Sequence, residues 1–82
     1  MYSVEFTKTG QKQFDKLPKD VQIRILGVLE RIRLRPFYFI KRKAGTPYFI
    51  MRAGDYRAVL DIKTENLAIY VVEVGHRKNI YN

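Results

Sequence analysis

The stretch that decides the fold is Arg52-Ala53-Gly54-Asp55-Tyr56-Arg57, because it places a tight turn at the entrance to an apolar run that continues to Ile62. Gly54 suits this turn, since glycine adopts positive φ angles without steric cost. The run itself alternates in polarity and is bounded by turn residues, which is the pattern of a β-strand. We therefore expect strands at Tyr48–Arg52 and Tyr56–Lys63, joined at Gly54.

A third strand is predicted over Leu67–Val74, which is rich in β-branched residues and follows the polar turn 64–66. If this strand pairs with Tyr56–Lys63 as a hairpin, Arg57 at the start of one strand lies close to Arg77, just past the end of the other. The three strands should form an antiparallel meander with a cationic cluster at one end of the sheet.

The N-terminal half predicts a strand followed by two helices. Tyr2–Phe6 alternates in polarity, and a short helix from about Lys8 to Lys16 follows, capped by Thr7 or Thr9. A second helix should carry Pro18 in its first turn and end near Leu34, before a proline. Its apolar stripe has the spacing of one helix face and consists of Val21, Ile25, Val28, Leu29 and Ile32.

These elements predict an α+β fold, with one twisted, mainly antiparallel sheet and two helices packed on one face. We interpret Phe37–Ile40 as a connection or a short edge strand, and Lys41–Lys43 as a loop beside the sheet. The aromatic exposure at residues 37–39 is compatible with a partner groove as well as with core. No repeat or linker interrupts residues 1–82, which predicts a single domain.

The charge balance favours a polyanionic partner. Sixteen Lys and Arg residues stand against eight Asp and Glu residues, giving a net charge of +8 and a pI near 10.0. Basic ribosomal, membrane-surface and merely soluble proteins share this property. The chain has no cysteine, no candidate metal cluster, no cofactor motif and no apolar segment long enough to span a membrane. We expect a cytoplasmic protein without a metal or cofactor.

Basic residues gather between positions 31 and 43, where no acidic residue occurs. Arg31, Arg33 and Arg35 can oppose the negative C-terminal pole of the second helix, which is a structural explanation. For the loop residues we favour phosphate contact, and these residues are Lys41, Arg42 and Lys43.

Strand alternation predicts which way Arg57 points. Ala58 and Leu60 should face the helices together with Tyr56 and Ile62, whereas Arg57, Val59 and Asp61 should face the other side. An open sheet face carrying arginine can hold phosphates and stack bases. Alternatively, Arg57 could form an ion pair with Asp61 or with Glu73 across the strands.

The tail groups His76, Arg77 and Lys78 with Tyr81. RNA can be cleaved without metal if a base takes the 2′-OH proton, cations stabilise the phosphorane and an acid protonates the leaving 5′-oxygen. Histidine, tyrosine and lysine can move these protons, and guanidinium groups suit the developing charge. A lone histidine in a basic terminus can equally be just solvated.

The chain resembles the RelE/ParE superfamily, the toxins of bacterial and archaeal toxin–antitoxin modules. The resemblance rests on the full order of elements, on the segment Lys43-Ala44-Gly45, on the signature at positions 52–57, and on Val74–Lys78 with Tyr81. It implies a compact sheet with two helices on one face. For the RelE branch it implies a ribosome-dependent mRNA interferase that cleaves in the A site and is held inactive by an antitoxin.

The resemblance also implies residue roles. Arg57 matches the arginine that contacts the scissile phosphate, Arg77 the second catalytic arginine, and Tyr81 the tyrosine that acts on the 2′-OH or stacks on a base. His76 stands where the best-known enterobacterial member has a lysine. That member also has two catalytic lysines in the segment matching Tyr48–Met51, which carries none here. Proton transfer would then fall to His76, Tyr81 or the lysines of the 41–43 segment.

The predicted catalytic residues are therefore Arg57, Arg77, Tyr81 and His76, and the predicted RNA-binding residues are Arg52, Lys41, Arg42, Lys43 and Lys78. The expected partners are mRNA, the ribosome and a cognate acidic antitoxin in a hetero-oligomeric complex, with no membrane partner. Two alternatives stay open: a ParE-like inhibitor of DNA gyrase, and a non-catalytic module that binds RNA or the ribosome.

Overall fold

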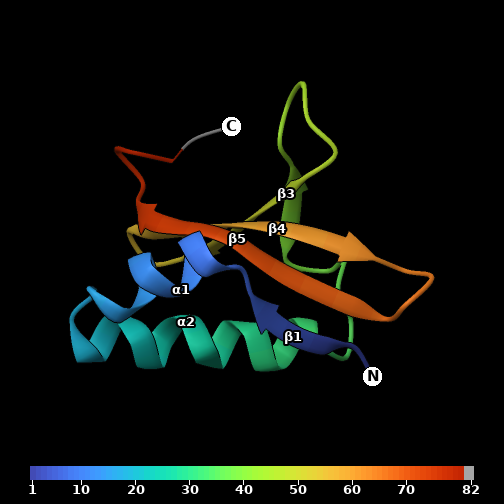
Figure 1. Cartoon of the computed structure of the whole chain (residues 1–82), viewed down its shortest axis with the longest axis horizontal. Coiled ribbons are helices and arrows are strands. Elements are labelled where there is room, and N and C mark those ends of the chain that lie inside the picture. The colour runs from blue at the N-terminus through green and yellow to red at the C-terminus, as the bar shows by residue number, and fades with distance from the viewer. Residues whose placement is uncertain (81–82) are drawn as a thin grey trace.

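Residues 1–80, which the computed structural model describes, form an α+β fold of two helices and a mixed five-stranded sheet (Figure 1). The helices are α1 (Lys8–Asp15) and α2 (Lys19–Ile32), and the strands are β1 (Ser3–Phe6), β2 (Ile40–Arg42), β3 (Phe49–Ala53), β4 (Tyr56–Lys63) and β5 (Ala68–His76). The sheet order is β1-β5-β4-β3-β2, in which β1 runs parallel to β5 and every other pair is antiparallel. The predicted fold class is confirmed.

Both helices lie on one face of the sheet, below it in Figure 1. The predicted stripe of α2 is buried there, with Ile25, Leu29 and Ile32 at most 2% exposed. They pack in one core cluster with Ala58 and Leu60 of β4, which confirms the predicted helix-facing side of that strand. Burial of these side chains supplies most of the driving force for folding. Arg57 and Val59 consequently belong to the opposite face, which the helices do not cover.

The edge of the sheet differs from the prediction at Lys41 and Arg42. We expected both on a loop, but they belong to β2, which pairs with β3 and makes the meander four strands long. Lys41 pairs with Ile50 and Arg42 pairs with Phe49, so the backbone of this basic segment is hydrogen-bonded to the apolar strand β3. This pairing is the physical reason that the segment is a strand. Elsewhere the strand bounds agree with the prediction to within two residues.

Thr7 rather than Thr9 caps α1, and it does more than cap. Its hydroxyl oxygen accepts the Gly10 N–H at 3.1 Å and also lies 3.2 and 3.1 Å from the carbonyl oxygens of Val71 and Val72 in β5. The side chain of Gln13 accepts the Val74 N–H at 2.8 Å. Thr7 and α1 therefore partner the backbone of β5 beyond the point where β1 ends.

These contacts surround a β-bulge. Val59 pairs with Glu73 while its neighbour Leu60 pairs with Val71, so Val72 has no partner in β4. A bulge shifts the alternation of side chains by one residue. Val71 and Val74 consequently both reach the helix-covered core, although they are three positions apart.

The β3–β4 turn has the predicted conformation, whereas the ends of α2 differ slightly from the prediction. Gly54 has a φ of +62°, as predicted for the β3–β4 turn. Pro18 is the N-cap residue of α2 instead of lying in its first turn, and the helix ends at Ile32, two residues before the predicted end. Neither helix in residues 1–80 has the length and apolar character needed to cross a bilayer.

Two glycine substitutions test the contact between α1 and β5. A Cβ atom at Gly10 would collide with the backbone carbonyl of Val71, whereas one at Gly27 in α2 would meet no atom within 4 Å. We expect Gly10→Ala to lower the free energy of unfolding by about 1–3 kcal/mol through overpacking. Gly27→Ala should raise it by up to about 1 kcal/mol through helix propensity.

Urea denaturation followed by circular dichroism measures both values. Gly27→Ala is the matched control, because it makes the same chemical change in an open helical position. If both substitutions raised the free energy of unfolding by the same amount, the close approach of α1 to the bulge would be contradicted.

Candidate nucleic-acid interface

Two arginines lie side by side on the open face of the sheet. Arg52 of β3 pairs directly with Arg57 of β4, so their side chains share that face. The Arg57 guanidinium donates from Nη1 to the carbonyl oxygens of Gly54 at 2.9 Å and Tyr56 at 3.0 Å. These bonds hold the guanidinium next to the turn and leave its other N–H groups available.

Neither arginine has an acidic partner within residues 1–80. Asp61, one of the two carboxylates that could have neutralised Arg57, instead lies 3.5 Å from the Lys63 ammonium. Glu73, the other, makes no ion pair in the described part of the chain. The ion-pair explanation of Arg57 is therefore wrong, and the arginine pair presents its charge to solvent.

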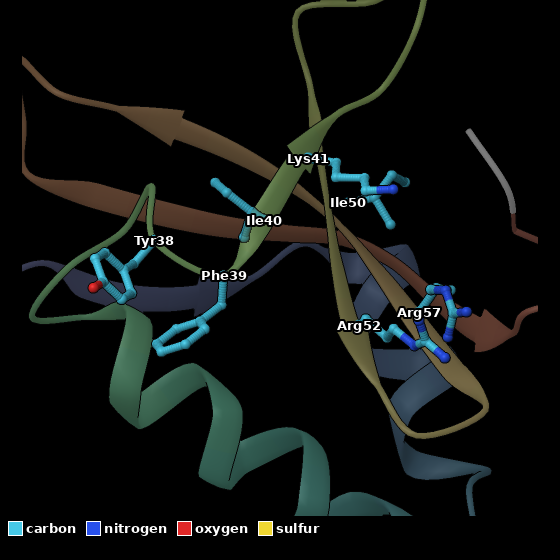
Figure 2. A pocket seen from close by; sticks show the side chains of 7 residues that line it. All are labelled: Tyr38, Phe39, Ile40, Lys41, Ile50, Arg52 and Arg57. Atoms are coloured by element: carbon cyan, nitrogen blue, oxygen red, sulfur yellow. The ribbon is translucent and has the colours of Figure 1, made fainter.

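A hollow of about 330 Å³ adjoins the arginine pair (Figure 2). Residues 38–41 line one side of it, and Ile50, Arg52 and Arg57 line the remainder. Lys41 reaches the hollow because it pairs with Ile50, which in turn pairs with Val59 on the open face. The lining thus combines three cations with apolar and aromatic groups and contains no carboxylate. Such a lining suits a phosphate-bearing, partly apolar ligand.

Arg77 borders the same turn as Arg57. Its backbone N–H donates to the Asp55 carbonyl at 2.8 Å, and its Nε lies 4.0 Å from the Asp55 carboxylate. Both side chains of this ion pair are more than half exposed, so it contributes little to stability. Arg57 and Arg77 therefore occupy the same end of the sheet, as the hairpin predicted, although Arg77 does not line the hollow.

His76 lies on the other face of the sheet from Arg57. It pairs with Tyr56, and the two rings meet edge to face with centroids 5.3 Å apart. Its Nδ1 accepts the Lys78 N–H at 3.2 Å. Gly75, not His76, is the residue opposite Arg57. The structure does not bring His76 to the arginine pair, and its catalytic role stays a prediction.

The remaining predicted residues are distributed over both faces. Arg42 shares the face of Phe49, with its guanidinium 5.7 Å from the ring centroid, and so points away from Lys41. Lys43 lines a second, smaller hollow on the open side, next to Val59 and Glu73. Lys78 is exposed beyond the end of β5. The predicted catalytic Tyr81 lies outside the described residues.

Sequence reasoning missed three contributions to this end of the molecule. Ile80 is 7% exposed and packs on Ile50 and Val59, so it closes the smaller core cluster on the open face. Arg24 of α2 reaches the β3–β4 turn, where a Cβ atom at Gly54 would meet its guanidinium. Phe39 lines the hollow with Lys41, which strand alternation would have indicated had β2 been extended backwards.

The ionisable groups of residues 1–80 include no cluster of three or more His, Cys, Asp or Glu side chains that would hold a metal ion. No polar or charged residue is buried in this part of the chain. The chemistry available at the open face is accordingly that of arginine and lysine side chains beside aromatic rings, with Arg52 and Lys41 exposed and Arg57 half-buried.

Comparison with known proteins connects this arrangement to a family. The model of the ParE toxin family, from the type II toxin–antitoxin system parDE, matches residues 4–81. Toxin RelG of Mycobacterium tuberculosis is 34% identical over 85 residues, an alignment that covers 98% of this chain and 95% of RelG.

Solved structures show the same fold. The toxin–antitoxin complex RelBE2 of Mycobacterium tuberculosis contains a chain with a TM-score of 0.83 and 26% identity, covering 93% of this chain and 91% of that one. The intact RelBE complex of E. coli gives 0.82 and 23% identity, covering 93% and 96%. The isolated E. coli RelE toxin gives 0.81 and 20% identity, covering 93% and 84%. The length of these matches and the signature at positions 52–57 agree: the chain belongs to the RelE/ParE superfamily and is a toxin of a type II toxin–antitoxin system.

Proposed function

We propose that this toxin is an endoribonuclease of the RelE type, which cleaves messenger RNA in the ribosomal A site and so inhibits translation. The observation that carries the proposal is the pair Arg52 and Arg57, adjacent on the open face and without an acidic partner in the described residues. Two guanidinium groups in this position suit the non-bridging oxygens of one phosphate. The 34% sequence identity with Toxin RelG over 98% of this chain supports the RelE branch of the superfamily.

The chemistry proposed is transesterification within the RNA. The 2′-oxygen loses its proton and attacks the adjacent phosphorus, the bond from phosphorus to the 5′-oxygen breaks, and that oxygen takes up a proton. The products are a 2′,3′-cyclic phosphate, which can open to a 3′-phosphate, and a 5′-OH end. Arg57 and Arg77 would stabilise the additional negative charge that develops on the phosphorane.

Proton transfer in this scheme needs one acceptor and one donor. Lys41 lines the same hollow as Arg57 and is the candidate donor to the leaving oxygen. Tyr81 is the candidate acceptor, because His76, the other predicted one, lies on the opposite face of the sheet from Arg57. The ribosome would hold the RNA strand in the geometry for in-line attack.

The proposed partners are the ribosome, mRNA and an antitoxin. Chains of similar fold are found in complexes described as RelBE toxin–antitoxin assemblies. An acidic antitoxin would complement the net charge of +8 and form a hetero-oligomeric complex in the cytoplasm. The same charge would attract ribosomal RNA once the antitoxin is removed.

Single arginine substitutions test the catalytic assignment. Arg57→Ala and Arg77→Ala should each slow cleavage of a ribosome-bound message by about 100-fold or more, because each removes a donor to the transition-state charge. Arg57→Lys should retain part of the rate, since an ammonium keeps the charge but not the paired hydrogen bonds. Primer extension on a defined message in a purified translation system maps and quantifies the cuts.

Arg31→Ala is the matched control, because Arg31 is exposed near the end of α2 and its loss changes the net charge by the same amount. It should cleave at the wild-type rate. Wild-type rates for both Arg57→Ala and Arg77→Ala would refute the assignment, and an absence of new cuts with the wild-type protein would refute the activity.

The second candidate function is inhibition of DNA gyrase, which the match to the ParE toxin family favours. A gyrase-directed toxin binds a protein and leaves RNA intact. We expect the purified toxin to leave gyrase-catalysed supercoiling of plasmid DNA unchanged at concentrations that stop translation. Inhibition of supercoiling without mRNA cleavage would establish this alternative instead.

A further inference from the structure

A cluster of exposed aromatic side chains precedes β2 and is not explained by the core. Phe37, Tyr38 and Phe39 are 52%, 66% and 50% exposed. Exposure of three consecutive rings leaves apolar surface in water, which costs free energy unless a ligand covers it.

Two of these aromatic residues line the hollow that adjoins the arginine pair. Tyr38 and Phe39 line it together with Lys41, Arg52 and Arg57. In Figure 2 their rings lie on one side of the hollow, and the two arginines lie on the other. One ligand in this hollow would meet aromatic surface at one end and positive charge at the other.

The rings are held in a defined arrangement. Tyr38 and Phe39 meet edge to face with centroids 5.0 Å apart, and the Arg35 guanidinium lies 5.6 Å from the Tyr38 centroid. The backbone N–H of Tyr38 also donates to the Arg35 carbonyl at 3.1 Å. An aromatic surface that is already ordered loses little conformational entropy when a planar ligand stacks on it.

From this arrangement we infer that Tyr38 and Phe39 form a platform in which an unpaired nucleobase of the RNA stacks on the face of one ring and the other ring supports that ring edge on, while Lys41 and Arg52 hold the phosphates that flank the base. The inference rests on the proposed RNA-directed function and adds to it a base-stacking site at Tyr38 and Phe39, two residues outside the predicted catalytic and RNA-binding sets. A single-stranded segment fits because its bases are free to splay out, whereas the bases of a duplex are already stacked.

The charge of the hollow also attracts acidic polypeptides. Binding that depends on base stacking must therefore be distinguished from binding that depends on charge alone. The lining favours RNA because a nucleobase stacks on the flat face of an aromatic ring, whereas the negative charge of a carboxylate is repelled by that electron-rich face. An acidic peptide would depend on Lys41 and the arginines and would be insensitive to the two rings.

The test compares two ligands and two protein surfaces by fluorescence anisotropy. The ligands are an end-labelled RNA hexamer, made non-cleavable by 2′-O-methyl groups, and an abasic hexamer with the same phosphates. The proteins are the wild type, the double variant Tyr38→Ala/Phe39→Ala and the conservative pair Tyr38→Phe and Phe39→Tyr. Ile23→Ala is the matched control, because Ile23 is 62% exposed on α2 and lines no described hollow.

The wild type should bind the hexamer about tenfold or more tightly than the abasic ligand, as expected for stacking of one base. The double alanine variant should lose this preference while its affinity for the abasic ligand stays the same. The dependence of its affinity on salt should also stay the same, since no charge has changed. The conservative variants and Ile23→Ala should behave as the wild type does.

Four results would overturn the inference. Two are an undiminished preference for the hexamer in the double variant and an equal loss for both RNA ligands. The third is an equal loss for labelled hexaglutamate, measured as an additional ligand, which would assign the surface to acidic peptides. The fourth is the absence of any preference in the wild type. Should the double variant fail to fold, Tyr38→Leu removes one π face with little loss of volume and takes its place.

Because the RNA cannot be cleaved and no ribosome is present, this experiment is independent of the catalytic assignment. A protein that cuts ribosome-bound mRNA but shows no stacking preference would retain the proposed function and lose the platform. A protein that stacks a base but does not cut would retain the platform and lose the nuclease.

Discussion

The structure depends on the hydrogen bonds between β5 at its bulge and the segment formed by Thr7 and α1. At the end of β1 the chain leaves the sheet, and β5 loses its outer neighbour after Val71. The Thr7 N–H then donates to the Val71 carbonyl, the Thr7 hydroxyl lies within hydrogen-bond distance of the Val72 carbonyl, and the Gln13 side chain accepts the Val74 N–H. These bonds replace those that a further strand residue would have made. Because unpaired backbone groups are costly, this contact allows the bulge to exist. The tight approach at Gly10 belongs to the same contact.

The bulge has a functional consequence, because it decides which face each residue at the end of β5 occupies. Counting alternate residues from Ile69 would place Gly75 on the helix side and His76 on the open side. With Val72 left unpaired, Gly75 lies opposite Arg57 and His76 lies opposite Tyr56. A glycine beside Arg57 leaves room above the sheet, and Ile80 partly fills that room. The open face therefore offers arginine, lysine and aromatic groups, while the histidine belongs to the other face.

The two faces of the sheet have different roles. The face toward α1 and α2 carries the larger core cluster, and the packing there fixes the strands in position. The open face has only a small cluster of Ile50, Val59 and Ile80, which supports the charged side chains around it. Placing cations without acidic partners on a rigid sheet costs little desolvation and keeps their charge available to a polyanion. The exposed rings before β2 extend the same surface toward the sheet edge.

The sequence by itself determined the order of elements, the β3–β4 turn, the buried stripe of α2 and the side of β4 on which Arg57 lies. Each of these follows from local conformational preference or from a regular period of apolar residues. Only the tertiary structure decided the pairing of β2, the position of the bulge, and hence the separation of His76 from Arg57 and of Arg42 from Lys41. The positions of a bulge and of an edge strand depend on hydrogen bonds to residues distant in the chain, such as those between Thr7 and β5. The periodic pattern of apolar residues within a segment does not predict these long-range hydrogen bonds.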